Sequence, residues 1–501
     1  MRTVFMNKTL AAPIPPAAWI VLLVAACLVP FVNKAFHIDD PLFLWTAEHI
    51  RIAPGDFYNF RVNWHGLEMP MTDAECNPPL MGFLLALASL VVGWGEVPLH
   101  LVAMLPAIAV ALGTFRLAQS YSPRPLLAAA VLVLTPGFLV CSSSVMCDVT
   151  MLAFWVWAIV FWERGLATHR LADFVWAGVL AGLCGLTKYS GLSVVPLLLA
   201  YALARHWQAK RSPAGTPALP GRWALALLIP IAMLGVYEWM AYRRYGVVLL
   251  ENATAYAREV RTGTLAGLPE RVVSGLVFAG GCGLPALLLA PCLWSRRALG
   301  IGVVLFAGIN GAALRHGWIS FASNWPLELQ RALFLLGGIS IVALALGDLR
   351  KHRDAVSVLL GLWVGGVLVF ATVFNWTLNG RTVLPMLPAV GLLIGRRLQS
   401  RKWDGGQTGT RSAGRWVWAG STRGSRCGCG GLSAGQHGTR GGPTAGQEVS
   451  GATESPRVSR SLGLSILYAE KRAAAAGRLE RGGVARRPGS HSSIRHSRAA
   501  T

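Results

Sequence analysis

Residues 17–41 read AAWIVLLVAACLVPFVNKAFHIDDP, an apolar run followed by the adjacent acids Asp39 and Asp40. A helix that crosses a bilayer needs roughly 20 predominantly apolar residues, and this run is close to that length. Carboxylates are costly in a membrane, so two of them at the mouth of a span form a candidate functional site. The alternative is a solvated helix end, where charged residues also collect.

The composition predicts a polytopic membrane protein and excludes a soluble enzyme with a single anchor. Of the 501 residues, 53% are hydrophobic and 14% are charged, whereas soluble domains carry roughly 25% charged residues. Most of the nine cysteines lie in or beside apolar segments, so no disulfide framework is predicted. No nucleic-acid partner is expected from the net charge of +23, because about half of the excess lies in residues 401–501.

Apolar segments recur as far as residue 397, and we predict about 12 transmembrane helices. The predicted spans are 17–33, 97–115, 125–141, 147–163, 172–187, 190–204, 222–240, 272–293, 298–314, 331–347, 355–374 and 382–397. One further apolar stretch, 79–94, either crosses the membrane or lies along its surface.

The positive-inside rule decides between these two placements of 79–94. If 79–94 lies along the outer interface as a juxtamembrane helix, the basic loops 116–124, 205–222, 295–297 and 348–353 all fall on the cytoplasmic side with the N-terminus. The fold class is then an all-α polytopic membrane protein with a large first outer loop, 34–96, and a second one, 241–271. The expected location is the plasma membrane, a bacterial inner membrane.

The tail 399–501 differs in kind from the membrane domain 1–398. It is rich in Gly, Ser and Arg and has no sustained hydrophobic periodicity, so we expect disorder. The abrupt change at its start also fits a shifted reading frame, and a natural basic tail is the alternative.

The predicted topology gathers the polar groups at the outer face. Asp39 and Asp40 lie in the first outer loop, Asp148 starts a span from that side, Lys188 lies in an outer turn, and Arg381 precedes the last span. Transporters usually place ionisable residues near the midplane. Charges gathered at one face instead favour an interfacial active site served by a lipid-borne substrate.

Several segments, read together, resemble the polyprenyl-phosphate-sugar-dependent transferases of the GT-C class. The most similar group is the protein-mannosyltransferase-like family that includes the lipid A aminoarabinose transferases. The segments are the acid pair 39–40, the Asn-Pro-Pro-Leu at 77–80, the Met-Cys-Asp at 146–148, the Glu-Arg-Gly at 163–165 and the turn GLCGLTK at 182–188. Their order, their spacing and their common position on the predicted outer side of the membrane carry the resemblance, which covers about residues 15–398.

Two later segments, at 324–326 and at 381–388, resemble the family more weakly. The chain also departs from the family pattern. Asn77 stands where a basic residue is usual, Cys147 replaces a Pro, and Tyr189 follows Lys188 where Gly is common. These departures bear on lipid-phosphate contacts and on the acceptor more than on the class of reaction.

The resemblance implies the roles of the acids. A carboxylate within hydrogen-bond reach can take the proton of an attacking hydroxyl. By this resemblance Asp39 is the general base, and Asp40 orients it or the acceptor.

The resemblance also implies a lipid-phosphate site. A polyprenyl phosphate leaving group needs positive charge, and Lys188 and Arg381 are the first candidates. Arg243 and Arg244 come next, and Asp148 and Asn77 complete the predicted phosphate-binding set.

Simpler structural roles compete with these assignments. Lys188 could cap a helix C-terminus or extend to the interface, Arg381 could anchor a span end, and Asp148 could be a helix N-cap. The sequence does not decide whether the protein binds a divalent metal. Its one candidate is Glu75 with an outer histidine such as His316, and two isolated ligands do not make a site.

We therefore expect a membrane glycosyltransferase that moves a sugar from a polyprenyl-phosphate donor to a glycan, lipid or protein acceptor at the outer face, with inversion. The alternative is a polytopic transporter or flippase of lipid-linked sugars, which would require an internal repeat and polar midplane positions. The sequence identifies neither the sugar nor the acceptor, and it does not give metal dependence, oligomeric state, or whether the chain is active.

Overall fold

A computed structural model describes residues 15–64, 66–211, 221–262, 267–315 and 321–403. The predicted tail lies outside the described residues apart from its first five positions, so its disorder and its origin stay predictions. The chain divides into two units at residues 406 and 407, and the fold described below belongs to the first.

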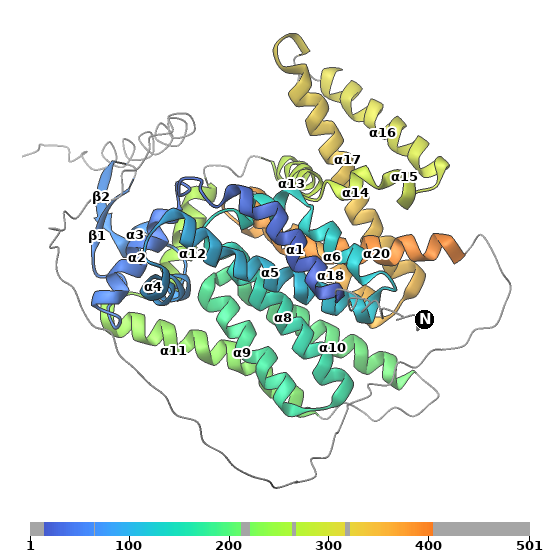
Figure 1. Cartoon of the computed structure of the whole chain (residues 1–501). Helices are drawn as coiled ribbons and strands as arrows, with labels where there is room; N and C mark the ends of the chain where they lie inside the picture. The colour runs from blue at the N-terminus through green and yellow to red at the C-terminus, as the bar shows by residue number, and fades with distance from the viewer. Residues whose placement is uncertain (1–14, 65, 212–220, 263–266, 316–320, 404–501) are drawn as a thin grey trace, which may run out of the picture. The chain divides into compact units, whose positions relative to one another are not determined.

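The first half of the membrane domain is a set of packed helices (Figure 1). They are α1 (Pro16–Leu28), α5 (Glu96–Tyr121), α6 (Pro125–Val133), α7 (Pro136–Ser142), α8 (Cys147–Thr168), α9 (Leu171–Thr187), α10 (Val194–Lys210) and α11 (Leu228–Tyr245), with short 3₁₀ turns η1 (Val29–Phe31), η2 (Tyr189–Ser193) and η3 (Gly221–Leu227). The pairs α5–α8, α8–α9 and α9–α11 form most of the contacts. Their core is apolar and includes the fully buried Trp162 and Tyr201.

The second half returns the chain to this core. Its helices are α12 (Leu249–Thr262), α13 (Leu268–Cys282), α14 (Pro285–Leu288), α15 (Ala290–Leu293), α16 (Arg296–Arg315), α17 (Phe321–His352), α18 (Ala355–Val369), α19 (Gly380–Val383) and α20 (Leu387–Trp403), with the π-helical turn η4 (Phe370–Phe374) and the turn η5 (Leu384–Met386). Helices α13 and α17 approach closely because Gly280 has no side chain; a Cβ there would lie 1.8 Å from the Phe334 carbonyl oxygen. The last helix, α20, packs against α6, and Leu387, Val390 and Ile394 are fully buried.

The structure confirms an all-α polytopic membrane protein, while the number of crossings stays a prediction. Among the described residues, five helices are long and apolar enough to span a membrane, or six if the α6–α7 pair, bent by 63°, is one span. Every one of the 12 predicted spans coincides with one or more helices. The predicted span 272–293 is divided into α13, α14 and α15, because Pro285 and Pro291 lack the backbone donors that a continuous helix needs.

The first outer loop contains the predicted short apolar helix. It is α4 (Leu80–Val92), which packs on α2 (Asp40–Ile52). On its other face Leu87, Leu90 and Val91 are exposed by 64–87%. Thirteen residues are too few to cross a bilayer, which favours the predicted position along the interface.

A small hairpin in the same loop was missing from the sequence prediction. Strands β1 (Arg61–Trp64) and β2 (Leu67–Pro70) pair antiparallel, with Trp64 opposite Leu67, and the short helix α3 (Met71–Ala74) follows. Gly66 has a φ of 81°, a conformation that glycine adopts readily in tight hairpin turns. The strands are only four residues long, so period-2 alternation could not reveal them.

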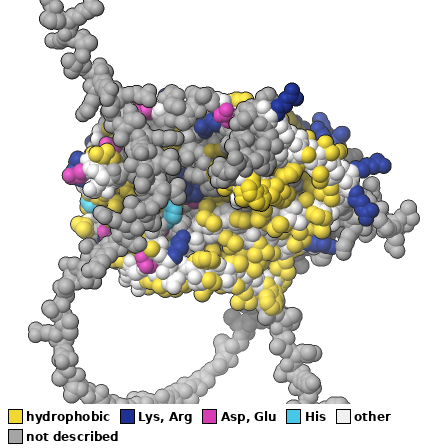
Figure 2. Space-filling model, turned by 90° about the horizontal axis from the view of Figure 1, so that it is seen from above, with side chains coloured by type: hydrophobic (Ala, Val, Ile, Leu, Met, Phe, Trp, Pro, Cys, Tyr) yellow, Lys and Arg dark blue, Asp and Glu magenta, His cyan; other side chains and the backbone are white. Residues whose placement is uncertain are grey.

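Charge is distributed asymmetrically on the surface. In Figure 2 hydrophobic side chains cover much of the visible face, most of the visible Asp and Glu side chains lie in its left half, and Lys and Arg gather at its right edge. The elements of the first outer loop (α2, α3, α4, β1 and β2) lie together at the left in Figure 1. This separation fits the predicted assignment of acidic outer loops and basic inner loops.

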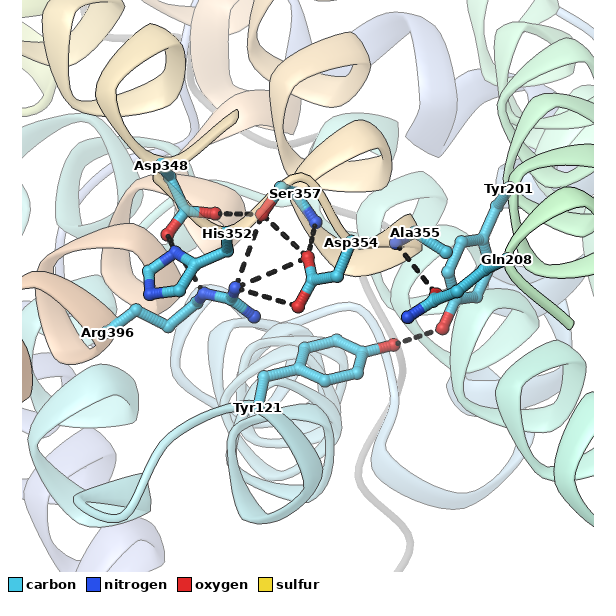
Figure 3. Close-up of polar contacts among 9 residues, drawn as sticks. All are labelled: Tyr121, Tyr201, Gln208, Asp348, His352, Asp354, Ala355, Ser357 and Arg396. Atoms are coloured by element: carbon cyan, nitrogen blue, oxygen red, sulfur yellow. Dashed lines mark hydrogen bonds and ion pairs between the residues drawn. The ribbon is translucent and has the colours of Figure 1, made fainter. Parts of the chain in front are cut away.

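A buried polar network joins the ends of α17, α18 and α20 (Figure 3). The Arg396 side chain is 8% exposed; its Nε lies 3.0 Å from Asp348 Oδ1 and its Nη2 lies 3.3 Å from Asp354 Oδ2. Asp354 also caps α18, because its Oδ1 accepts a hydrogen bond from Ser357 N at 2.7 Å. Although burial acts to raise it, the Ser357 hydrogen bonds and the Arg396 charge hold the pKa of Asp354 below its usual value. The network fastens the last helix to its neighbours.

Replacing Arg396 by Ala should destabilise the membrane domain by about 3–5 kcal/mol, because two partly or fully buried carboxylates lose their counter-ion. The readout is the melting temperature of the detergent-purified protein. Arg350→Ala, an exposed arginine near the end of α17, is the control and should change it little. Equal melting temperatures for the two variants would contradict a stabilising role for the network.

Candidate active site

Asp39 and Arg381 form an ion pair at the end of the helix bundle that the sequence predicts to be the outer one. Asp39 Oδ2 lies 2.8 Å from Arg381 Nη1, and the two side chains are 29% and 31% exposed. Asp39 is the N-cap residue of α2, yet its side chain makes no cap hydrogen bond. The carboxylate is therefore directed to Arg381 and remains accessible from solvent.

Asp148 and Lys188 form a second pair. Lys188 Nζ donates to Asp148 Oδ1 at 2.7 Å, and the Asp148 side chain is 2% exposed. The simple N-cap role for Asp148 is wrong, because Met146 is the N-cap of α8 and no side-chain cap is made. Lys188 follows the last residue of α9 and uses its amine for Asp148. The carboxylate in the first turn of α8 is also favoured by the helix dipole.

The two pairs adjoin. Burial acts to lower the pKa of Arg381, but the carboxylates of Asp148 and Asp39 raise it by more, and the net shift is upward. The Nη1 of Arg381 also lies 2.9 Å from Met146 Sδ, directly before α8. Four residues predicted from the sequence, Asp39, Asp148, Lys188 and Arg381, thus share one site.

Local backbone structure fixes both cations. The α19 turn that carries Arg381 begins with a capping box, in which Asn379 Oδ1 accepts from Thr382 N at 3.1 Å and Thr382 Oγ1 accepts from Asn379 N at 3.3 Å. The turn after Lys188 folds directly over the end of α9, and a Cβ at Gly191 would lie 2.5 Å from the Cys184 carbonyl oxygen. Only glycine permits that approach.

Asp40 is buried behind Asp39, with no exposed surface. Its Oδ2 accepts a hydrogen bond from His37 N at 2.6 Å. Burial raises the pKa of Asp40, although the backbone amides of His37 and Val145 and the nearby histidines His37 and His100 act against the shift. A buried acid held by the backbone suits a positioning role for the start of α2 better than direct contact with a substrate.

Glu75 belongs to the same site and is 5% exposed. Its Oε1 accepts hydrogen bonds from Asn77 N at 2.8 Å and Asn77 Nδ2 at 2.7 Å. Burial raises the pKa of Glu75 to about 7, against the lowering effects of the Asn77 hydrogen bonds and of Lys188; Asp39 adds to the rise. Asn77, predicted as a phosphate ligand, thus uses its side-chain amide to hold Glu75.

Three buried acids each keep one oxygen without a hydrogen-bond partner among the described residues: Asp40 Oδ1, Glu75 Oε2 and Asp148 Oδ2. The described residues contain no group of three or more His, Cys, Asp or Glu side chains able to hold a metal, and His316 lies outside them. The Glu75 carboxylate does not by itself make a metal site, so metal dependence stays an open prediction. Unpaired buried oxygens are costly, and hydroxyls of a ligand or water would satisfy them.

The structure does not bring Arg243 and Arg244 to this site. Arg243 is exposed, and Arg244 pairs with Asp56 in the first outer loop. The hydrogen bond from Arg244 lowers the pKa of Asp56 to about 2. Arg244 therefore joins α11 to the first loop.

Sequence reasoning missed Lys34. Its Nζ donates to Ser143 Oγ at 3.1 Å. Burial lowers the pKa of Lys34, and the charge of Asp40 acts in the opposite direction. A lysine directly after the first span and five residues before the acid pair was the available signal.

The fold was compared with solved structures. ArnT from Cupriavidus metallidurans, bound to undecaprenyl phosphate, is similar at 18% identity with a TM-score of 0.50; the match covers 77% of this chain and 62% of that one. The Archaeoglobus fulgidus oligosaccharyltransferase, in complex with Zn and sulfate, matches at 16% identity with a TM-score of 0.46, covering 78% and 49%. The chain thus spans about three fifths of the ArnT length and half of the oligosaccharyltransferase length. No curated protein sequence matches the chain.

The architecture seen in the ArnT comparison is the fold of the GT-C glycosyltransferases, a class of polytopic membrane proteins, so the resemblance read from the sequence is confirmed. More particularly, residues 76–237 match the family model for dolichyl-phosphate-mannose-protein mannosyltransferase. That range contains Asn77, Asp148 and Lys188. Asp39 and Arg381 lie outside it; the contact of Arg381 Nη1 with Met146 Sδ at 2.9 Å and the nearby charge of Asp148 join them to it.

The stability of the wild type should fall as pH rises, and the Glu75→Gln variant should not show this fall. The native state holds the Glu75 proton up to about pH 7 while the ordinary pKa is 4.5, so wild-type stability falls between these values and levels off above them. The difference amounts to at most roughly 3 kcal/mol.

Melting temperatures of wild type and Glu75→Gln, measured in detergent at about pH 5 and about pH 8, check this prediction. The melting temperature of Glu75→Gln should increase relative to that of wild type from the lower to the higher pH. Glu96→Gln, an exposed acid of the same loop, should show no such change. A pH-independent gap for Glu75→Gln would contradict burial of an ionisable Glu75.

Proposed function

We propose that the chain is a membrane glycosyltransferase that moves a sugar from a polyprenyl-phosphate donor to an acceptor at the outer face. The observation that carries this proposal is the pairing of two cations with two carboxylates, Asp39–Arg381 and Asp148–Lys188, in one partly exposed site. The relation to ArnT, which binds undecaprenyl phosphate, supports a donor of this kind. The proposed acceptor is a glycan, lipid or protein, and the proposed location is a bacterial inner membrane with a cytoplasmic N-terminus.

The cations and the acids have complementary roles in the proposed reaction. Without a donor, Arg381 neutralises Asp39 and Lys188 neutralises Asp148. A lipid phosphate that enters the site competes for both cations, because charge-assisted hydrogen bonds to phosphate are strong. Engagement of Arg381 by the phosphate then frees Asp39 to accept a proton.

In the proposed transfer, an acceptor oxygen attacks the anomeric carbon from the face opposite the phosphate. Asp39 takes the proton of the acceptor hydroxyl as the new glycosidic bond forms. The bond between the anomeric carbon and the phosphate oxygen breaks, and its electron pair leaves with the polyprenyl phosphate. Lys188 and Arg381 stabilise this developing charge, and attack from the opposite face inverts the configuration.

Replacing Asp39 by Asn should lower sugar transfer by about 10²–10⁴-fold, the usual contribution of a positioned general base. The assay follows labelled sugar from a polyprenyl-phosphate donor into the acceptor fraction of membranes. Asp73→Asn, an exposed acid of the same loop, is the control and should retain activity. Near-normal transfer by Asp39→Asn, at equal membrane insertion, would overturn the assignment of the base, and lipid movement without covalent transfer would identify a carrier.

Replacing Arg381 by Gln should weaken binding of undecaprenyl phosphate about 10- to 100-fold, the equivalent of one lost charge-assisted hydrogen bond. Binding is measured from the rise in melting temperature as the lipid is titrated into the detergent-purified protein. Arg350→Gln, on the predicted inner side, should bind like wild type. Unchanged affinity in Arg381→Gln would exclude this arginine from the phosphate site.

A further inference from the structure

Glu238, near the outer end of α11, connects two segments through its two carboxylate oxygens. Its Oε1 accepts a hydrogen bond from the Tyr189 hydroxyl at 2.7 Å, and its Oε2 accepts one from Leu250 N at 3.2 Å. Tyr189 directly follows Lys188, and Leu250 is the second residue of α12. One side chain therefore links the turn that carries the phosphate-binding candidate to the start of the second outer loop.

The outer end of α11 also holds the first loop. The Tyr245 hydroxyl accepts from Tyr58 N at 3.0 Å, and the Tyr58 hydroxyl donates to the Asn77 carbonyl oxygen at 2.7 Å. Arg244 pairs with Asp56. Three side chains of α11, Glu238, Arg244 and Tyr245, thus reach the first loop, the Lys188 turn and the start of α12, and among the described hydrogen bonds Glu238 is the one of the three that contacts the Lys188 turn.

The backbone of Lys188 is fixed by two hydrogen bonds, from Lys188 N to the Cys184 carbonyl oxygen at 3.1 Å and from Gly191 N to the Lys188 carbonyl oxygen at 2.8 Å. Lys188 is in extended conformation, with φ −157° and ψ 129°, and its long side chain is only partly buried, at 26% exposure. A lysine side chain loses rotamer freedom on being fixed. The backbone that carries it is held by α9 before it and by the turn η2 after it, and the Tyr189 hydroxyl adds a hydrogen bond from this turn to Glu238 of α11.

We propose that Glu238 and Tyr189 are positioning residues that hold Lys188 at the lipid-phosphate site and make its position depend on the start of α12. The hydrogen bond between a phenol and a carboxylate is charge-assisted and directional, so it fixes the direction in which the chain leaves Lys188. The proposal rests on the proposed function, in which Lys188 binds the phosphate of the donor.

The test uses the full chain in detergent micelles, with undecaprenyl phosphate as the probe. Tyr189→Phe removes the hydroxyl and keeps the ring, and it should weaken lipid binding about tenfold, the equivalent of one modest hydrogen bond. Tyr242→Phe is the matched control, because this tyrosine lies on α11 and is 55% exposed; its affinity should equal that of wild type. The melting temperature without lipid reports on folding.

Glu238 supplies a conservative rescue. Glu238→Ala should lose about tenfold in affinity, because both contacts are removed. Glu238→Gln should bind nearly like wild type, because the amide oxygen can accept from Leu250 N while the amide NH₂ donates to the Tyr189 hydroxyl. Equal losses for the Ala and Gln variants would overturn the hydrogen-bonded link.

A background without the Lys188 charge separates positioning from general stabilisation. The double variant Lys188→Gln with Asp148→Asn removes the ion pair without leaving a buried carboxylate, and adding Tyr189→Phe to it should cause no further loss of affinity. The same tenfold loss in that background would show that Tyr189 does not act through Lys188. If the double variant itself binds the lipid like wild type, the proposed function fails at Lys188; if it binds poorly and Tyr189→Phe alone binds normally, only the positioning role fails.

Discussion

The site depends on the mutual neutralisation of charges at the border of an apolar helix bundle. Lys188 and Arg381 can remain partly buried because Asp148 and Asp39 stand 2.7 and 2.8 Å away. Removal of one partner of such a pair is far more costly than its formation is favourable. This constraint keeps the starts of α2, α8 and α19 and the end of α9 together. In the proposed reaction, a phosphate replaces a carboxylate as partner of each cation.

Two further acids at the same border, Asp40 and Glu75, are buried. Asp40 and Glu75 are each held by backbone or amide groups on one oxygen, and their other oxygens have no partner among the described residues. Burial raises the pKa of both groups, that of Glu75 to about 7. The second anchoring region, the Arg396 network at the other end of α17, α18 and α20, has no part in this chemistry and stabilises the last helix.

Much of the fold was predictable from hydrophobic patterning. Long apolar segments can satisfy their backbone hydrogen bonds in a membrane only as helices, and each predicted span coincides with a helix. The interruptions were harder to predict. The bend between α6 and α7 and the division of 272–293 arise at prolines whose effect depends on neighbouring packing, and the β1–β2 hairpin is too short for its periodicity to stand out.

For the site, the sequence by itself determined which residues are chemically suitable: two acids after the first span, an acid that begins α8, a lysine after α9 and an arginine before the last helix. It did so because ionisable residues are rare in such a chain and gather at one predicted face. Only the tertiary structure decided their partners. Asp39 forms an ion pair with Arg381, which lies near the other end of the membrane domain in the sequence. Arg244 pairs with Asp56, and Asn77 donates to Glu75. Tyr189, the residue after Lys188, donates a hydrogen bond to Glu238. Partner choice depends on where helix ends meet in space, and no local pattern in the chain encodes that.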